Sequence, residues 1–395
     1  MKGPAALFKK YLALVIIYFC NCLPIKKNKI FFFSYYGSQY GDNPKYITEY
    51  ILEKYPPGHY EMVWAFNDPN TKPQLPFKKV KTMSLKYFYE LCTAKVIITN
   101  FRTTKFFVKR KGQFYIQTWH SSLRLKQIEK DAEEALPRHY VEMAQKDSAK
   151  CDLLLSGCRF STETFRRCFW YSGPILEKGT PRNDVFWRGN LFKKEKILQA
   201  LGLDPNENII LYAPTFRKSH DMSVYDLDVE ALLDGVKSRL SGEWKLLVKL
   251  HPHLINTATK LGLEVMDVTK YEDIQELLYI ADILITDYSS LMFDFALTKK
   301  PCFLYVPDIE AYMAGERKLY FDFNELPFLS ARNNQELAEK IRMFSPRDYQ
   351  RKLQHFLEKI GSYEEGAACE HLLQSIDEVC FGMKPRRKEA RHEAV

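Results

Sequence analysis

The sequence predicts an α/β protein whose strands form parallel, doubly wound sheets. Short apolar runs alternate with segments of helical periodicity along most of the chain. Polar turns rich in Gly, Pro, Ser or Asp separate these segments. A length of 395 residues is enough for two domains, and 46% hydrophobic and 14% aromatic residues indicate well-filled cores rather than disorder.

The amino terminus predicts a basic, apolar segment, residues 1–28, that lies on the inner face of a membrane. Residues 1–41 contain no Asp or Glu, and lysines flank the apolar stretch 11–23. That stretch is too short to cross a hydrocarbon core of about 30 Å as a helix. Two alternatives stay open: a signal peptide, for which Cys20–Pro24 is a poor cleavage site, and a helix packed on the protein's own core.

The first half of the chain then predicts strands alternating with helices. Ligands of such a sheet collect at the carboxyl ends of its strands. The expected helices are 44–54, 85–93 and 161–169, with a helical region at 129–150. The expected strands are 30–34, 62–66, a short one at Val80, 96–99, 114–117 and 153–156.

The loop after the strand 114–117 is the most informative part of this half. It places His120 at a strand end, where a general base could meet a substrate. Eight Lys or Arg and no acid lie between Glu90 and Glu129, which suits an anionic substrate. A histidine that only makes structural hydrogen bonds, on a solvated basic face, is the alternative interpretation.

A turn-rich stretch at 179–184 predicts the boundary between two domains. A connecting loop explains its Gly and Pro but does not call for Arg182, Asn183 and Asp184 together. We therefore expect a first domain at residues 29–185, a second at 186–380, and a basic tail at 381–395.

The second half repeats the alternation. Its most distinctive unit, residues 271–308, predicts helix, strand, polar turn, helix and strand in that order. The other expected helices are 194–201, 333–344, 349–360 and 366–379, and the other expected strands are 209–213, 244–250 and 267–268.

Three turns of this half carry candidate ligand groups. Asp287, Ser289 and Ser290 lie between a strand end and a helix start, which suits a phosphate, although helix capping alone would also explain them. Thr215 and Arg217 follow the strand 209–213, and an Arg there could fork onto a phosphate. His251 and His253 follow the strand 244–250 without a nearby carboxylate or Cys, so we predict no metal site.

Five motifs together resemble those of the CDP-glycerol glycerophosphotransferase family, which builds teichoic acids and related polyol-phosphate polymers. In chain order they are QTWHSSLRLK, GTPRND, LYAPTFR, KLHPH and ADILITDYSSLMFDFALTKKP. The resemblance covers roughly residues 30–375. It implies the GT-B arrangement, two Rossmann-like domains facing across a cleft. One departure is Ser121-Ser122, where the family has Gly-Thr.

The resemblance also implies roles for these residues. His120 matches the histidine expected to deprotonate an acceptor hydroxyl, and His251 one that contacts the donor diphosphate or protonates the departing phosphate. The positions expected near the donor or in the cleft are Thr215, Arg217, Asp287, Ser289 and Ser290, with Arg182, Asn183 and Asp184.

The function expected from this resemblance is transfer of glycerol phosphate from CDP-glycerol to a hydroxyl of a polyprenol-linked saccharide or polyol-phosphate acceptor, with release of CMP. Transfer of ribitol phosphate from CDP-ribitol, a GT-B glycosyltransferase and a non-catalytic membrane-associated binding protein are the alternatives. We expect a peripheral protein on the cytoplasmic membrane face, with reduced thiols for its nine scattered cysteines.

The net charge of +9 favours anionic partners; we expect the donor and the membrane surface rather than nucleic acid. No tightly bound cofactor is predicted, although Mg²⁺ carried by the donor is compatible with the pattern. The lack of a long additional amino-terminal domain favours a priming enzyme over a polymerase.

Overall fold

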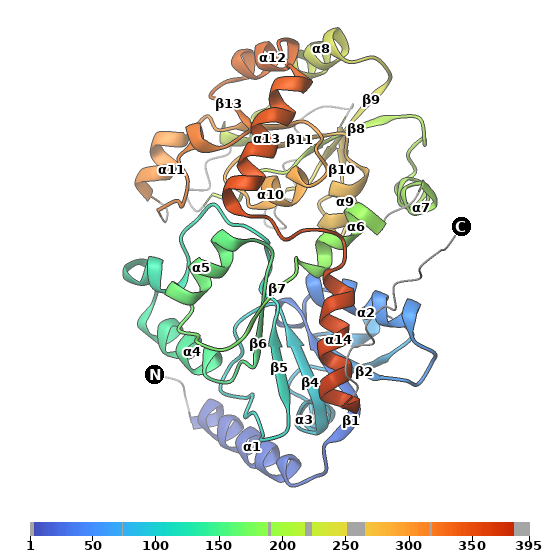
Figure 1. The fold of residues 1–395 in the computed structure, drawn as a ribbon, viewed down its shortest axis with the longest axis vertical. Coiled ribbons are helices and arrows are strands. Elements are labelled where there is room, and N and C mark those ends of the chain that lie inside the picture. The colour runs from blue at the N-terminus through green and yellow to red at the C-terminus, as the bar shows by residue number, and fades with distance from the viewer. Residues whose placement is uncertain are drawn as a thin grey trace, which may run out of the picture.

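The computed structural model describes residues 4–72, 74–188, 191–217, 223–250, 265–315 and 318–382. The chain forms two α/β domains, one below and one above in Figure 1. Each is built on one parallel sheet with helices packed against it. The predicted fold class of two doubly wound domains is confirmed.

The first domain holds a seven-stranded sheet in the order β3-β2-β1-β4-β5-β6-β7, with every neighbouring pair parallel. The strands are β1 (Lys26–Phe33), β2 (Glu61–Phe66), β3 (Lys78–Lys81), β4 (Ala94–Thr99), β5 (Phe114–Gln117), β6 (Leu153–Ser156) and β7 (Ile175–Glu177). The helices are α1 (Pro4–Asn21), α2 (Asp42–Lys54), α3 (Leu85–Thr93), α4 (Arg138–Ser148), α5 (Arg159–Cys168) and α6 (Val185–Arg188).

The second domain holds a six-stranded parallel sheet in the order β10-β9-β8-β11-β12-β13. The strands are β8 (Asn208–Tyr212), β9 (Trp244–Val248), β10 (Val265–Asp267), β11 (Ile283–Thr286), β12 (Cys302–Tyr305) and β13 (Leu329–Ala331). The helices are α7 (Leu191–Leu201), α8 (Val229–Arg239), α9 (Ile274–Ile280), α10 (Leu291–Ala296), α11 (Ile309–Gly315), α12 (Asn334–Arg342) and α13 (Pro346–Ile360).

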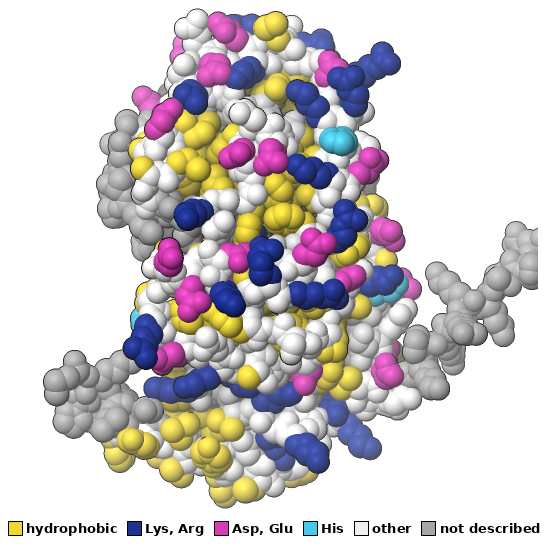
Figure 2. All heavy atoms as spheres, turned by 60° about the vertical axis from the view of Figure 1, so that its left-hand side comes forward, with side chains coloured by type: hydrophobic (Ala, Val, Ile, Leu, Met, Phe, Trp, Pro, Cys, Tyr) yellow, Lys and Arg dark blue, Asp and Glu magenta, His cyan; other side chains and the backbone are white. Residues whose placement is uncertain are grey.

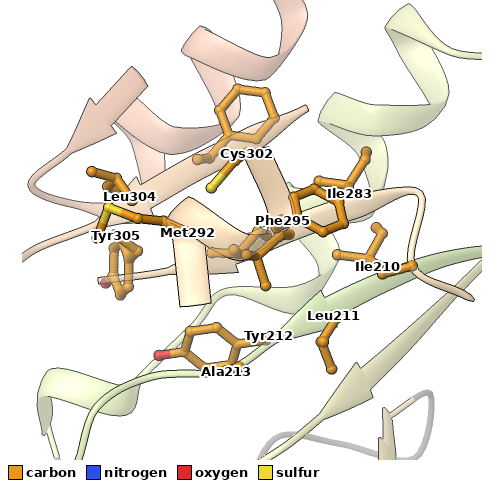
Figure 3. Packing of buried hydrophobic residues seen from close by; sticks show 14 of the residues in the cluster. Ile210, Leu211, Tyr212, Ala213, Ile283, Met292, Phe295, Cys302, Leu304 and Tyr305 are labelled. Carbon is orange, nitrogen blue, oxygen red and sulfur yellow. The ribbon is translucent and has the colours of Figure 1, made fainter. Parts of the chain in front are cut away.

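The core of the second domain shows why the short apolar runs form strands. Ile210, Leu211, Ile283 and Cys302 are buried on the central strands, and Phe295 of α10 belongs to the same core cluster (Figure 3). Because helices cover a parallel sheet on both faces, its strands carry nearly continuous apolar runs rather than alternating ones. This explains why the pattern of the sequence located these strands closely.

Both sheets reverse their strand order at one place, between β1 and β4 and between β8 and β11. Ligands of open parallel sheets bind outside the carboxyl ends of the strands at such a switch point. The loops after β1 and β5 face those after β8 and β11 across the space between the domains, as the cavities described below show.

The last helix, α14 (Ala368–Phe381), packs in the first domain, whereas the sequence analysis placed it in the second, at 186–380. Its buried face, including Cys369, Leu372 and Ile376, belongs to the core of the first domain. Figure 1 shows α14 beside α2 in the lower domain. The chain therefore returns to its first half at 361–367, where residues 361 and 363 hydrogen-bond to the backbone of residues 159 and 157.

Helix α1 packs partly on the protein's own core, which was one of the alternatives for the amino terminus. Ala13, Ile17 and Cys20 pack into the core cluster that also holds α3. The outward face remains apolar, with Val15 and Phe19 65% and 70% exposed, and Figure 2 shows hydrophobic side chains gathered at that end of the molecule. Among the residues that the structure describes, no helix has the length and apolar character needed to cross a bilayer.

Candidate active site

Two adjoining cavities occupy the cleft between the domains. One, of about 480 Å³, is lined by His120 and Trp119 of the first domain and by Ser289 and Ser290 of the second. The other, of about 760 Å³, extends along the carboxyl ends of the second sheet past Lys249. Both are lined by Tyr35, Thr215, Ile274, Ser289 and Leu291. The predicted His120 and the predicted serines therefore share one cavity.

The geometry of His120 suits a general base. Its Nδ1 lies 3.2 Å from the main-chain oxygen of Asn100; a carbonyl only accepts, so Nδ1 carries the proton. The neutral ring then presents the lone pair of Nε2 to the cleft. Trp119, in a left-handed conformation at φ 52°, stacks on the imidazole with ring centres 4.4 Å apart.

Solvent inside the cleft reaches the His120 ring, but the surrounding protein still desolvates it. Desolvation is the largest influence on this ring and lowers the pKa of His120 below its ordinary value, while the nearby Asp42 opposes the change. The uncharged form that can accept a proton is therefore favoured near neutral pH.

Asn100 and Asp42 support this arrangement, and the sequence did not single them out. The side-chain oxygen of Asn100 accepts from the backbone N–H of Tyr35 at 3.0 Å, and its Nδ2 donates to Asp42 at 3.1 Å. Asp42 also accepts from the Tyr35 hydroxyl at 2.6 Å. These bonds fix Asn100, and with it the carbonyl that orients His120.

Ser121 and Ser122, which stand where the family has Gly-Thr, do not strain the backbone of the loop. Ser121 is not among the described residues with positive φ, whereas Trp119 is. The conformation for which glycine is suited is therefore required one residue before His120 and not after it. The carbonyl of Ser122 accepts from the Ser161 hydroxyl at 2.6 Å, which holds the loop against α5.

Asp287 ties the ends of β8 and β11 together. It accepts from the backbone N–H of Thr215 at 2.9 Å and from the Thr215 hydroxyl at 2.7 Å. It is 1% exposed and is not among the described residues that line either cavity. The turn it holds presents Ser289 and Ser290, and the Ser290 side chain makes no hydrogen bond to cap α10. The Ser289 hydroxyl oxygen accepts from the Leu291 N–H at 3.3 Å. Asp287 therefore positions the turn, and binding of a phosphate by the two serines stays a prediction.

Arg217 lies beneath the cleft rather than in its wall. It pairs with Asp308 at 2.7 Å and with Asp287 at 2.8 Å, and its guanidinium lies 4.7 Å from the centre of the Tyr288 ring. It is 4% exposed and does not appear among the described residues lining either cavity. In this state its charge is compensated by two carboxylates, so its direct contact with a donor phosphate stays a prediction.

The loop at 181–184 joins the domains. Arg182 lines the smaller cavity and pairs with Asp42 of the first domain at 3.3 Å and with Asp294 of the second. Desolvation of Asp294 raises its pKa, and Arg182 opposes that change. Arg182 therefore links the two domains at the wall of the smaller cavity, with a buried carboxylate from each domain beside its guanidinium.

The neighbours of Arg182 are structural. Asn183 donates to Asp294 at 3.2 Å and accepts from Gln275 at 2.7 Å. Asp184 accepts from the first backbone N–H groups of α14 at 3.0 and 2.8 Å, and so caps that helix from a distant part of the sequence. Neither side chain is among the described groups lining the two cleft cavities.

Glu364 lies in the segment that returns to the first domain. Its carboxylate accepts from the Thr180 hydroxyl at 2.6 Å and the Thr180 N–H at 3.0 Å, and from Asn183 at 3.2 Å. Burial raises the pKa of Glu364 to about 7, although these hydrogen bonds act in the opposite direction. The junction of the domains thus contains a carboxyl group that titrates near neutrality.

His251 and His253 lie outside the described residues, so the predicted second catalytic histidine has no geometry to test. Within the described ranges, no group of three or more His, Cys, Asp or Glu is placed to hold a metal ion. Participation of Mg²⁺ brought with a donor stays a prediction.

A family model described as CDP-Glycerol:Poly(glycerophosphate) glycerophosphotransferase matches residues 16–378. The match therefore includes both domains, His120 and the Asp287–Ser290 turn.

Individual proteins show the same likeness. A teichoic acid poly(glycerol phosphate) polymerase of Bacillus spizizenii is 31% identical, over 92% of this chain and 95% of the relative. Its counterpart in Bacillus subtilis is 32% identical over 90% of this chain, which spans only about half (49%) of that relative. The solved structure of the wall teichoic acid polymerase TagF superimposes with a TM-score of 0.82 at 29% identity, covering 96% of this chain and 98% of that one.

Proposed function

The chain belongs to the CDP-glycerol:poly(glycerophosphate) glycerophosphotransferase family, and we propose that it transfers glycerol phosphate from CDP-glycerol to a hydroxyl of a membrane-linked acceptor, releasing CMP. One observation carries the proposal. An uncharged, oriented histidine and a turn bearing two serines line opposite sides of one cavity between the domains.

The reaction would begin when Nε2 of His120 removes the proton of the acceptor hydroxyl. The acceptor oxygen forms a bond to the glycerol-bearing phosphorus of CDP-glycerol. The bond from that phosphorus to the bridging oxygen breaks, and CMP leaves with the electron pair. Such a transfer asks mainly for positioning and charge stabilisation, which fixed hydrogen-bond donors provide. His251 stays the proposed partner of the departing phosphate.

The second domain would hold the donor. Thr215 and Ser289 line both cavities, so a diphosphate lying between them could extend into each. The larger cavity lies at the carboxyl ends of β8, β9 and β10 and has room for the nucleoside. Lys249 is one of its lining residues. The cavity beside His120 would then receive the glycerol phosphate and the acceptor.

The acceptor would be the end of a polyol-phosphate chain carried on a membrane lipid. A relative of almost the same length is called a polymerase, so the length of the chain does not favour a priming enzyme as the sequence alone suggested. The exposed apolar face of α1 supports attachment to the inner membrane surface. Ribitol phosphate from CDP-ribitol remains the second candidate for the transferred group.

The test is transfer by the purified protein onto a lipid-linked disaccharide, with and without a glycerol phosphate end. CDP-glycerol, CDP-ribitol and a nucleotide sugar are supplied in turn, with Mg²⁺ and with a chelator, and products are weighed by mass spectrometry. We expect a mass increase of one or more glycerol phosphates and matching release of CMP. Product formed only from the nucleotide sugar, or from none of the donors, would refute the proposal.

Two variants separate chemistry from folding. His120→Ala should lower the transfer rate by roughly 10²- to 10⁴-fold and leave CDP-glycerol binding intact. His139→Ala changes an exposed histidine on α4 and should have no effect. A His120→Ala protein with the wild-type rate would remove that residue as the base.

A further inference from the structure

The cavity that holds His120 extends along the first domain beyond the groups used so far. Its wall there consists of Ile128, Glu129, Leu136 and Tyr140, which lie between β5 and the first turn of α4. None of these residues was expected to be functional. Apolar side chains beside one carboxylate make a surface unlike the serine-bearing wall of the second domain.

Glu129 is held in this wall with little freedom. It is 3% exposed, and its two carboxylate oxygens accept from an Arg102 nitrogen at 3.0 Å and from the Tyr140 hydroxyl at 2.7 Å. Each oxygen has a second lone pair available for another donor. The carboxylate is thus a fixed acceptor at the edge of the cavity.

Pairing with Arg102 alone does not account for this placement. Arg102 already pairs with Asp147 at 3.3 Å and donates to Ser148 at 2.7 Å, and it stacks over Phe169 at 3.9 Å. Glu129 also adopts a left-handed conformation at φ 54°, which costs free energy for any residue with a side chain. Non-glycine residues in such conformations gather at ligand sites, as Trp119 beside His120 does in the same cavity.

The chemistry of the wall matches a small polyol. The carbons of such a ligand would lie against Trp119, Ile128 and Leu136, while a hydroxyl donates to the carboxylate. His120 and Glu129 line the same cavity, so one polyol chain end bound there can offer one hydroxyl to Nε2 and another to the carboxylate. A carboxylate repels phosphate, so the anionic parts of both substrates belong elsewhere in the cleft.

We propose that Glu129 determines acceptor specificity by accepting a hydrogen bond from the hydroxyl next to the attacking one on the acceptor's terminal polyol. This inference rests on the proposed function, since it assigns the acceptor half of the same cavity. The ligand class is a polyol chain end that carries vicinal hydroxyls.

The test compares two lipid-linked acceptors that differ by one hydroxyl. One ends in glycerol phosphate and the other in 1,3-propanediol phosphate, which keeps the attacking hydroxyl and lacks its neighbour. We expect wild type to prefer the first by about tenfold in kcat/KM, the usual worth of a hydrogen bond to a charged group. In Glu129→Gln the preference should shrink to within about twofold, mainly through the KM for the glycerol-ended acceptor, because the amide is a weaker acceptor.

Glu133→Gln is the matched control, since Glu133 is exposed in the same short helical segment, Glu129–Ala135, and it should keep the wild-type preference. Binding of CDP-glycerol reports whether Glu129→Gln is folded. Should it fail to fold, Glu129→Asp keeps the charge opposite Arg102 but withdraws the carboxylate, and it should lose the preference as well.

The outcomes are distinct. A wild type that uses both acceptors equally, or a Glu129 variant that keeps the wild-type preference, would overturn the inference and leave the proposed function standing. A wild type that transfers glycerol phosphate to neither acceptor would overturn the proposed function, and the inference with it.

Discussion

Replacing Glu364 with Gln should change how the stability of this protein depends on pH. Glu364 is buried at the junction of the domains, and its pKa is raised from an ordinary 4.5 to about 7 by desolvation. Below pH 4.5 the group is protonated in the folded and the unfolded chain. As the pH rises toward 7 the unfolded chain loses this proton first, so the folded state becomes progressively less favourable.

The magnitude follows from the two pKa values. Each pKa unit corresponds to about 1.4 kcal/mol, so this one carboxyl group should cost the folded state roughly 3 kcal/mol above pH 7. An amide cannot titrate and is spared this cost. Relative to wild type, Glu364→Gln should therefore gain about 3 kcal/mol between pH 4.5 and pH 8, whatever the constant effect of the substitution on the hydrogen bonds to Thr180.

The assay is urea unfolding of wild type and variant at half-unit intervals from pH 4.5 to 8. Only the pH dependence of the difference in unfolding free energy is interpreted, because other titrating groups then cancel. Glu365→Gln serves as the control, since Glu365 is the exposed neighbour. A difference between wild type and Glu364→Gln that stays flat across this range would show that Glu364 titrates normally and refute the reasoning.

Three further expectations follow from the site and from α1. The pKa of His120 is lowered by desolvation, so the acid limb of the kcat/KM profile should fall below pH 6.5, the ordinary value of a histidine; stopped assays of CMP release at varied pH locate it. Arg182→Met leaves two buried carboxylates unpaired and should destabilise the protein by roughly 3–5 kcal/mol, measured by urea unfolding. Replacing both Val15 and Phe19 by Glu should lower the fraction of protein that sediments with anionic vesicles. Transfer to a soluble acceptor analogue should continue.

Each of these expectations has a contrary result. An acid limb above pH 6.5 would mean that nearby acids outweigh desolvation at His120. An Arg182→Met protein as stable as wild type would show that the pairs at the domain junction contribute nothing net. Unchanged vesicle binding after both α1 replacements would mean that another surface contacts the membrane.

The sequence predicted the fold closely where burial imposes a simple pattern. The helix 85–93 and the strands 114–117 and 153–156 were placed to the residue, because continuous apolar runs and end signals suffice to define such elements. The three-residue strands β7 and β13 were missed, since so short an element carries no periodicity. Helix α14 was found but assigned to the wrong domain, because which sheet a helix covers depends on the path of the chain.

The sequence predicted the site residues that follow strand ends, but it did not predict the residues that hold them in place. His120, Ser289 and Ser290 lie in one cavity because the carboxyl ends of parallel strands are where ligand groups converge. Asn100 acts through its main-chain carbonyl, which any residue could provide, so no residue type signals it. Arg217 is the opposite kind of case. Its residue type suggested a phosphate contact, but it pairs with two acidic residues 70 or more positions away in the chain, which the sequence pattern could not reveal.

The return of α14 to the lower domain bears on how this protein is made. Its residues fill a core begun by β1, so that core stays incomplete until residues 368–381 have left the ribosome. At ordinary rates of translation, this delay is on the order of tens of seconds. Throughout that interval the apolar surface that α14 covers is exposed, so we expect the growing chain to be prone to aggregation. We also expect deletion of α14 to destabilise the amino-terminal domain.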